Sequence, residues 1–217
     1  MKLRSNSRRI LFGELEGDNY LLKSIEQDSV KYFLDIGANV GFISIMARML
    51  HPKMKIFSVE PHPDVYENLI DNVEHLRIKT LNGALGNGNI FYLLKSRKTD
   101  LCNSFTDKKT ENHSIQSYTL GSLVRKFKID VDDLRIKIDC EGAEKYMIGD
   151  EQSENILRKC KVCAIEVHDK IDNDSSRFMN WFIKILENTH TINISRQCRS
   201  LLMLNAIRVV THKTQED

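Results

Sequence analysis

The segment from Asp35 to Gly41 forms a turn that could hold a nucleotide-like cofactor. An apolar run ends at Ile36, and two glycines and Asn39 then precede a helical pattern. Glycine lets a ligand approach the backbone closely, and a helix N-terminus offers N–H groups and partial positive charge. We therefore expect this turn to bind a cofactor, through Asp35, Gly37, Ala38, Asn39 and Gly41.

Glu60 ends the next apolar run, which covers residues 55–59. Its carboxylate could accept hydrogen bonds from both hydroxyls of a ribose, and an acid at this position is the expected partner of such a turn. An ordinary turn between a strand and a helix is the alternative interpretation of Gly37 and Gly41. Glu60 is the observation that argues against it.

The glycine spacing also bears on which cofactor is bound. Dinucleotide sites follow the pattern G-x-G-x-x-G, in which the middle glycine lets the backbone approach a pyrophosphate. This chain has Asn39 at the middle position and Asp35 beside the turn, which disfavours a doubly negative group. S-adenosylmethionine has no phosphate, and a carboxylate attracts its sulfonium and ammonium groups. The sequence therefore predicts S-adenosylmethionine rather than NAD.

A second group of reactive side chains follows two later apolar runs. Asp139 and Glu141 come after one run, and Glu166 and His168 end the next. The carboxyl ends of parallel strands share one edge of a sheet, so we expect all four beside the Asp35 turn. Together they could take a proton from a hydroxyl during methyl transfer, with crowding raising the pKa of one carboxylate. The alternative is structural, since acids also favour the first turn of a helix.

A hard divalent cation among these oxygens remains an alternative, but their spacing is not specific for one, so no residue is assigned as a metal ligand. Cys160 and Cys163 form a C-x-x-C at the start of an apolar strand, without a second pair or a nearby histidine. We expect them to be buried rather than to bind zinc or act in redox chemistry.

Hydrophobic periodicity alternates strands with helices along most of the chain. We expect strands near 9–12 and at 30–36, 55–59, 78–81, 90–94, 114–119, 134–139, 160–167, 191–195 and 201–209, and helices at 18–28, 42–50, 61–73, 120–127, 142–159 and 175–188. This order predicts an α/β fold with a doubly wound, mainly parallel sheet.

Residues 86–119 break this rhythm and are the one expected insertion. Residues 86–89 indicate a hairpin turn between strands, residues 95–113 form a polar loop, and the insertion as a whole is long enough to act as a substrate lid. Asn82 and Ala84, just before the insertion, are candidates for contacting an adenine.

Composition indicates one globular domain over residues 1–217, with residues 1–30 as an N-terminal extension. The chain has 217 residues, of which 41% are hydrophobic and 29% charged, and a net charge of +2. This charge gives no reason to expect nucleic acid or an anionic membrane as a partner. Without an apolar run of about 18 residues or a signal-peptide pattern, we expect a cytoplasmic protein. Nothing in the sequence indicates its oligomeric state.

Several motifs in this order resemble the FkbM-type S-adenosylmethionine-dependent methyltransferases. The resemblance covers roughly residues 30–170, and the block after the strand at 134–139 is its most specific part. The matching motifs are Asp35–Gly41, Val59–His62 with Asn68 and Asn72, Ala84–Gly86, Thr119–Leu120, Lys137–Glu144 and Ile165–His168.

The resemblance implies a Rossmann-like class I methyltransferase fold with a seven-stranded sheet whose last strand, at residues 201–209, is antiparallel. It also implies O-methylation of a hydroxyl on a sugar, glycan or polyketide-like small molecule. Gly121 stands where the family usually has aspartate, and Cys140 where an aliphatic residue is commoner. The alternatives are an RNA 2′-O-methyltransferase, which the near-neutral charge disfavours, and a non-catalytic cofactor-binding scaffold.

Overall fold

The computed structural model describes residues 18–23, 30–93, 105–106, 108–109, 113–168, 175–198 and 201–209. The expected strand near residues 9–12 therefore lies outside the described residues.

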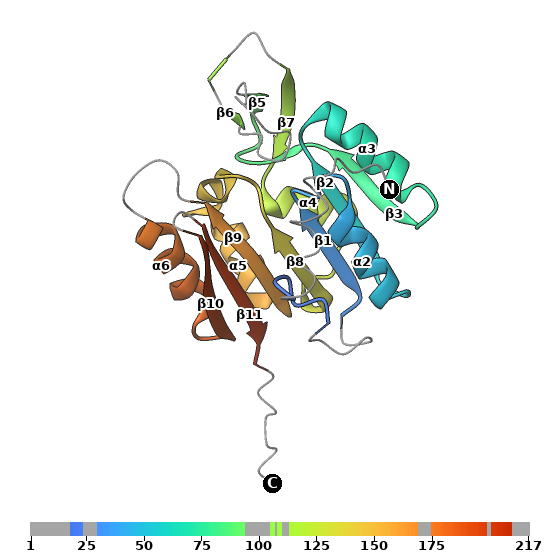
Figure 1. Ribbon diagram of the computed structural model, residues 1–217. Helices are drawn as coiled ribbons and strands as arrows, with labels where there is room; N and C mark the ends of the chain where they lie inside the picture. The colour runs from blue at the N-terminus through green and yellow to red at the C-terminus, as the bar shows by residue number, and fades with distance from the viewer. Residues whose placement is uncertain are drawn as a thin grey trace.

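A mainly parallel seven-stranded sheet forms the centre of the molecule (Figure 1). Its spatial order is β10-β11-β9-β8-β1-β2-β3. Strand β11 is antiparallel to both of its neighbours, whereas β9, β8, β1, β2 and β3 pair in parallel. The predicted fold and its single reversed strand are confirmed. The strands are β1 (Tyr32–Ile36), β2 (Lys55–Glu60), β3 (Ile78–Asn82), β8 (Leu134–Ile138), β9 (Val162–His168), β10 (His190–Cys198) and β11 (Leu201–Arg208).

The central strands are buried on both faces, which explains their nearly continuous apolar runs. Successive side chains point to opposite faces, so Leu34 and Ile136 belong to one core cluster and Phe33 and Ile56 to another. The second face also carries charged side chains at buried positions, among them Asp35, Arg135, Lys137 and Glu166. Some of the charged side chains near the candidate site therefore belong to strands of the sheet itself.

Helices cover both faces of the sheet (Figure 1). Helices α2 (Phe42–Leu50) and α3 (Pro63–Val73) pack on the face of Phe33. On the other face lie α4 (Leu120–Phe127), α5 (Glu151–Lys159) and α6 (Ser175–Leu186), with the short 3-10 helices η1 (Val131–Asp133) and η2 (Ala143–Met147). Proline at the first position of α3 and Thr119, whose hydroxyl accepts from Ser122 N–H at the start of α4, explain where these helices begin.

Two predicted helices were wrong in part. The helix expected at 142–159 is divided into η2 and α5, because Gly149 adopts a left-handed backbone (φ 76°) and Asp150 caps a new helix by accepting from Ser153 N–H. Of the helix expected at 18–28, residues 18–23 form turns instead, with Asp18 and Leu21 at positive φ.

Three strands of the expected insertion and β4, which lies just before it, form a separate four-stranded sheet, ordered β4-β7-β5-β6. It contains β4 (Ala84–Leu85), β5 (Ile90–Leu93), β6 (Phe105–Thr106) and β7 (Ser114–Tyr118). The prediction of a hairpin turn at 86–89 was wrong, because β4 and β5 lie on opposite sides of β7. The turn instead wraps around Ser117, whose hydroxyl accepts from Gly88 N–H and donates to the carbonyl of Asn89.

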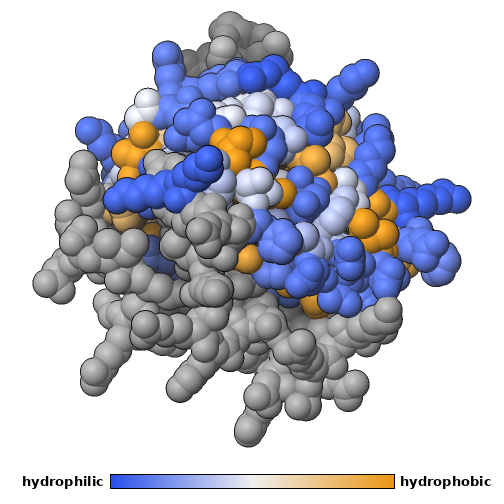
Figure 2. Space-filling view, turned by 90° about the horizontal axis from the view of Figure 1, so that it is seen from above, coloured by the Kyte–Doolittle hydropathy of each residue, from blue (hydrophilic) through white to orange (hydrophobic). Residues whose placement is uncertain are grey.

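The surface seen from above, the side of the small sheet, is mainly hydrophilic where it is coloured, with apolar residues in separate patches (Figure 2). No helix in the described ranges could cross a membrane, and the longest, α6, has 12 residues. Cys160 and Cys163 are fully buried, as predicted.

A hollow of about 670 Å³ lies at the amino ends of β1 and β2, at the edge of the sheet opposite the predicted site. Its lining is basic and partly aromatic, and consists of Tyr32, Arg48, Pro52, Lys53, Met54, Lys55, Ile56, Phe57, Arg77, Lys79, Phe127 and Lys128.

Candidate active site

Glu60 joins the end of β2 to the turn that follows β1. Its carboxylate accepts hydrogen bonds from the backbone N–H groups of Asn39 and His62, both at 2.9 Å. The side chain is buried, and burial raises the pKa of Glu60 to about 7 although both hydrogen bonds oppose the shift. A carboxylate at this position can accept further hydrogen bonds from a ribose, because each of its oxygens has more than one acceptor site.

The two glycines of the turn allow other residues of the protein to pack directly against the turn. A Cβ atom on Gly37 would lie 1.7 Å from the carbonyl oxygen of Asp139, and one on Gly41 would lie 2.7 Å from a methyl carbon of Leu69. Both glycines also adopt a positive φ. The turn after β1 therefore touches the segment after β8 directly, and glycine is required at residue 37 for that contact.

Asp35 lies beneath the turn and is fully buried. It accepts a hydrogen bond from the Ser44 hydroxyl at 2.6 Å and lies 3.4 Å from the ammonium group of Lys137. Lys137 in turn donates to the carbonyl of Gly37 at 2.7 Å and lies 3.3 Å from the carboxylate of Asp139. Asp35 therefore acts on the turn through Lys137, and its predicted contact with a cofactor stays a prediction.

Asn82 and Ala84 both occupy structural positions. The Asn82 amide donates to the carbonyls of Glu60 and Pro61 and so holds the end of β2. Ala84 is buried in β4, where it pairs with Ser117 of β7. Their contacts with an adenine remain predictions, as does the lid role of residues 95–113, which lie mostly outside the described residues.

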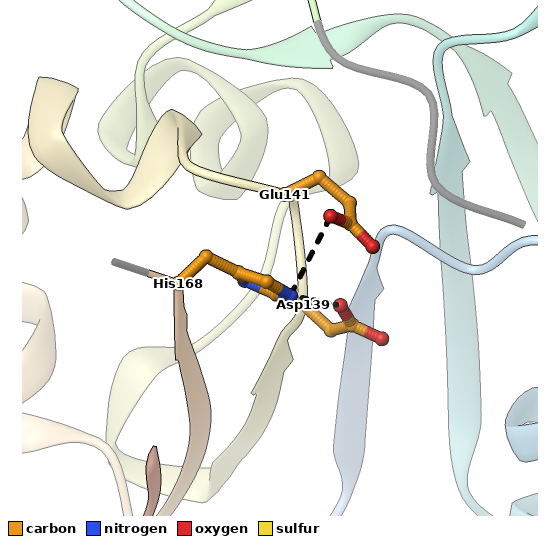
Figure 3. Close-up of side chains that lie close together, drawn as sticks. All are labelled: Asp139, Glu141 and His168. Carbon is orange, nitrogen blue, oxygen red and sulfur yellow. Dashed lines mark ion pairs between the residues drawn. The ribbon is translucent and has the colours of Figure 1, made fainter. Parts of the chain in front are cut away.

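The predicted proton-transfer residues converge on one imidazole (Figure 3). His168, the last residue of β9, directs Nε2 toward carboxylate oxygens of Asp139 at 3.8 Å, Glu141 at 3.7 Å and Glu166 at 3.8 Å. Its other ring nitrogen, Nδ1, lies 3.1 Å from the buried carboxylate of Glu144. The structure thus brings together all four residues that the sequence predicted for this group.

Negative charge dominates around His168. Burial lowers the pKa of its imidazole, but the hydrogen bond with Glu144 and the charges of Glu144, Asp139 and Glu141 outweigh this effect and raise the pKa to about 9. Burial, followed by the charge of Asp139, raises the pKa of Glu166 above its ordinary value. The cluster can therefore hold a proton at neutral pH.

The carboxylates around His168 and the turn after β1, at residues 37–41, form one continuous candidate site. Asp139 N–H donates to the carbonyl of Ile36 at 3.0 Å, so the segment after β8 continues alongside the end of β1. Through Gly37 and Lys137 the same segment contacts the turn. A ligand bound at the turn would place its reactive end beside Asp139 and His168.

Sequence reasoning missed three contributors to this site. Glu144 was not among the predicted site residues, although its position in the block Lys137–Glu144 was a usable signal. Lys137 was not predicted as a site residue either. Tyr20, whose hydroxyl donates to Glu166 at 2.9 Å, gave no signal, because it lies in a segment that was expected to be a helix.

Comparison with known proteins identifies a methyltransferase relative. The hexuronic acid methyltransferase AglP of Haloferax volcanii is 24% identical over 166 residues, which make up 76% of this chain and 66% of that protein. The chain thus spans just under two thirds of that relative's length.

Solved structures share the fold at low sequence identity. The methyltransferase FkbM from Methylobacillus flagellatus superposes with a TM-score of 0.53 at 15% identity, covering 82% of this chain and 44% of that chain. Fibrillarin from Aeropyrum pernix, in a structure with natively bound S-adenosyl-L-methionine, gives a TM-score of 0.50 at 16% identity and covers 88% and 74%.

The family model of the methyltransferase FkbM domain matches residues 35–192, which include the cofactor turn, Glu60 and the whole cluster around His168. This match spans well over half of the chain, and the chain therefore belongs to the FkbM methyltransferase family.

Proposed function

We propose that the protein is an S-adenosylmethionine-dependent O-methyltransferase that acts on a hydroxyl of a sugar. The observation that carries this proposal is the position of Glu60 and the His168 cluster at one edge of the sheet, on either side of the turn after β1. Membership of the FkbM family and the hexuronic acid methyltransferase among its relatives support it.

The residues around the turn fit the proposed cofactor. Glu60 presents a carboxylate to the ribose hydroxyls, at the end of the strand next to the turn. The carboxylate of Asp139 is about a quarter exposed and would attract the cationic sulfonium and ammonium groups. Two acids, Glu60 and Asp139, flank the turn, which fits a cofactor without phosphate.

S-adenosylmethionine, when bound, supplies a methyl group whose bond to sulfur breaks as the acceptor oxygen attacks, leaving the neutral thioether S-adenosylhomocysteine. The chain's part is to hold the acceptor oxygen in line, at about 3 Å from the methyl carbon, and to accept the hydroxyl proton. Asp139 is the proposed acceptor of this proton, and the deprotonated form of His168, whose Nε2 lies 3.8 Å from the same carboxylate, is the next candidate.

The charge of the cluster favours a hydroxyl over a carboxylate as the attacking group. Asp139, Glu141, Glu144 and Glu166 surround His168 and would repel an anionic oxygen, whereas a hydroxyl needs a nearby base. A hexuronic acid offers both kinds of oxygen. We therefore propose a methyl ether rather than a methyl ester as the product.

Calorimetry with S-adenosylhomocysteine tests the cofactor assignment. Glu60→Ala removes one or two charge-assisted hydrogen bonds, worth about 1.5–3 kcal/mol each, and should weaken binding at least tenfold. Glu74→Gln, which changes an exposed acid outside the site, should bind normally. Unchanged affinity in Glu60→Ala would remove the assignment.

Transfer of labelled methyl groups to uronic acid glycans, neutral glycans and RNA tests the acceptor. The expected product is labelled glycan whose label resists mild alkali, as an ether does. An alkali-labile label would identify an ester and overturn the hydroxyl assignment. Labelled RNA would establish the alternative acceptor, and cofactor binding without any transfer would favour a scaffold role.

A further inference from the structure

We propose that Asp139, Glu141 and His168 form a binding site for a divalent first-row metal ion of the Mn²⁺ type. Each of the three residues offers one ligand atom, and these atoms lie within 4.8 Å of one another. The sequence analysis left a divalent cation open but assigned no residue as its ligand. Metal binding can be tested without methyl transfer, and only the role of the ion in catalysis rests on the proposed function.

The distances leave room for an ion between the ligand atoms. Two atoms that are each about 2.1 Å from a metal lie about 3.4 Å apart at a tetrahedral angle and about 4.2 Å apart when opposite. His168 Nε2 lies 3.8 Å from Asp139 Oδ1 and 3.7 Å from Glu141 Oε2. These separations are too long for hydrogen bonds but lie inside the range for ligands of one ion.

His168 is oriented as a metal ligand. Its side chain is 6% exposed, and Nδ1 lies 3.1 Å from an oxygen of Glu144, whose side chain is 2% exposed. When a metal ion displaces the proton of Nε2, the proton on Nδ1 stays donated to Glu144 and the lone pair of Nε2 is directed at Asp139 and Glu141 (Figure 3). Carboxylate–histidine pairs of this kind commonly orient metal-binding imidazoles. Nε2 lies 3.7–3.8 Å from the carboxylate oxygens of Asp139, Glu141 and Glu166, and these separations leave space for an ion beside the nitrogen.

Charge and ligand type indicate which ion would bind. Glu166 lies 3.8 Å from the same nitrogen and adds negative charge beside the ligands, which favours a dication. Carboxylates suit hard ions such as Mg²⁺ and Mn²⁺, whereas imidazole suits first-row transition metals. A set of two carboxylates and one imidazole therefore fits Mn²⁺ or Co²⁺ better than Mg²⁺ or Ca²⁺.

The proposed ion would sit where the acceptor hydroxyl must lose its proton. Asp139 touches the cofactor turn through Lys137 and Gly37, so an ion held there would lie close to the reacting atoms. A bound dication lowers the pKa of a coordinated hydroxyl and holds its oxygen in place. The cluster would then act on the acceptor through the ion as well as by accepting the proton.

Titration of the metal-free full chain with Mn²⁺, followed by the EPR signal of the free ion, tests the site. We expect one Mn²⁺ per chain and tighter binding than Mg²⁺ in competition. Asp139→Asn, Glu141→Gln and His168→Asn should each weaken Mn²⁺ binding at least tenfold. In His168→Asn the new amide can still donate to Glu144 while Nε2 is lost, and Glu74→Gln is the matched control and should bind normally.

A thermal unfolding series provides the second readout. Increasing Mn²⁺ should raise the unfolding temperature of the wild type and of Glu74→Gln, because the ion binds only the folded state, and the shift should disappear in the three ligand variants. The series also shows whether each variant is folded. Absence of Mn²⁺ binding by the wild type, with and without S-adenosylhomocysteine, would overturn the proposal, as would binding that the three variants leave unchanged.

The two proposals can fail separately. Glu60→Ala should lose S-adenosylhomocysteine and keep Mn²⁺. Mn²⁺ binding without cofactor binding would retain the metal site and remove the methyltransferase assignment. Cofactor binding and methyl transfer without Mn²⁺ binding would retain the methyltransferase assignment and remove the metal site.

Discussion

Single buried carboxylates set the chemistry of this site. Glu60 is almost fully enclosed, and within the described part of the chain its carboxylate accepts hydrogen bonds from two backbone N–H groups. Burial costs the charged form more than these donors return, so the pKa rises to about 7. The hydroxyls of a bound ribose would add donors and favour the carboxylate. Cofactor binding and loss of the Glu60 proton are therefore linked.

Cofactor affinity should depend on pH through Glu60. The affinity for S-adenosylhomocysteine should rise up to about tenfold between about pH 6 and about pH 8, because only the ionised form accepts both ribose hydrogen bonds. Calorimetry across this range measures the rise. Glu60→Gln should bind more weakly with a flatter profile, and an equally steep profile in that variant would assign the effect to another group.

When no cofactor is present, the contribution of Glu60 to stability should fall as the pH rises, whereas cofactor affinity should rise. The pKa of Glu60 is about 7 in the folded chain against 4.5 as its ordinary value, so the folded state binds the proton more tightly. The contribution of this proton to stability is present at low pH and is lost as the pH rises toward and through 7. The free energy of unfolding, compared between the wild type and Glu60→Gln, should therefore diverge in this window.

Asp139 is the residue whose charge the transfer step should need most. Asp139→Asn preserves size and removes the negative charge, and we expect a loss of about 10²-fold or more in rate, the range for a positioned base. Single-turnover transfer to a sugar acceptor at saturating cofactor is the measurement, with Glu74→Gln as control. Near-normal turnover would make Asp139 structural.

At the level of elements, the site depends on close contact between two strand-to-helix connections. The turn after β1 and the segment after β8 approach so closely that the carbonyl of Asp139 occupies the space of a side chain on Gly37. Parallel pairing of β1 with β8, from Tyr32 opposite Leu134 to Ile36 opposite Ile138, brings both connections to the same edge. The cofactor turn and the His168 cluster are therefore coupled by packing.

Two glycine substitutions should separate crowding from backbone strain. Gly37→Ala causes both a steric clash and backbone strain, and it should lower the free energy of unfolding by about 3 kcal/mol or more. Gly88→Ala also has a positive φ, at 92°, but its Cβ would meet nothing within 4 Å, so it should cost only about 1 kcal/mol. Urea unfolding of both variants tests this, and equal losses would contradict the role of the contact with Asp139.

Across the whole molecule, the segment at residues 18–23 completes the site from the other end of the chain. Tyr20 is buried against the face of the sheet that also carries Lys137 and Glu166, and its ring lies 5.4 Å from the ammonium group of Lys137. Its hydroxyl donates to Glu166 across a sequence separation of 146 residues. The position of Glu166 beside His168 therefore depends on this long-range contact.

Tyr20→Phe should lower the free energy of unfolding by about 1–3 kcal/mol, the usual range for a buried hydrogen bond to a charged group. Chemical unfolding measures the loss. In the Glu166→Gln background the same substitution should cost less, because the charged acceptor is gone. The same loss in both backgrounds would show that the effect comes from packing of the ring alone.

The sequence by itself determined most of the order of strands and helices, the turn after β1, the place of Glu60 at the end of β2, and the grouping of Asp139, Glu141, Glu166 and His168. Periodicity and turn chemistry act over a few residues, and parallel strands end at one edge of a sheet, so Asp139 and His168 could be placed together before the structure was known. The reversed strand β11 and the FkbM family followed from ordered motifs.

Only the tertiary structure decided which groups touch. The fit of Gly37 against Asp139, the support of His168 by Glu144 and the hydrogen bond from Tyr20 to Glu166 depend on strand register and on packing between distant segments. The pairing of β4 with β7, in place of a hairpin, is of the same kind. Such contacts cannot be predicted from the periodicity of the sequence, because each involves one residue whose partner is distant in the chain.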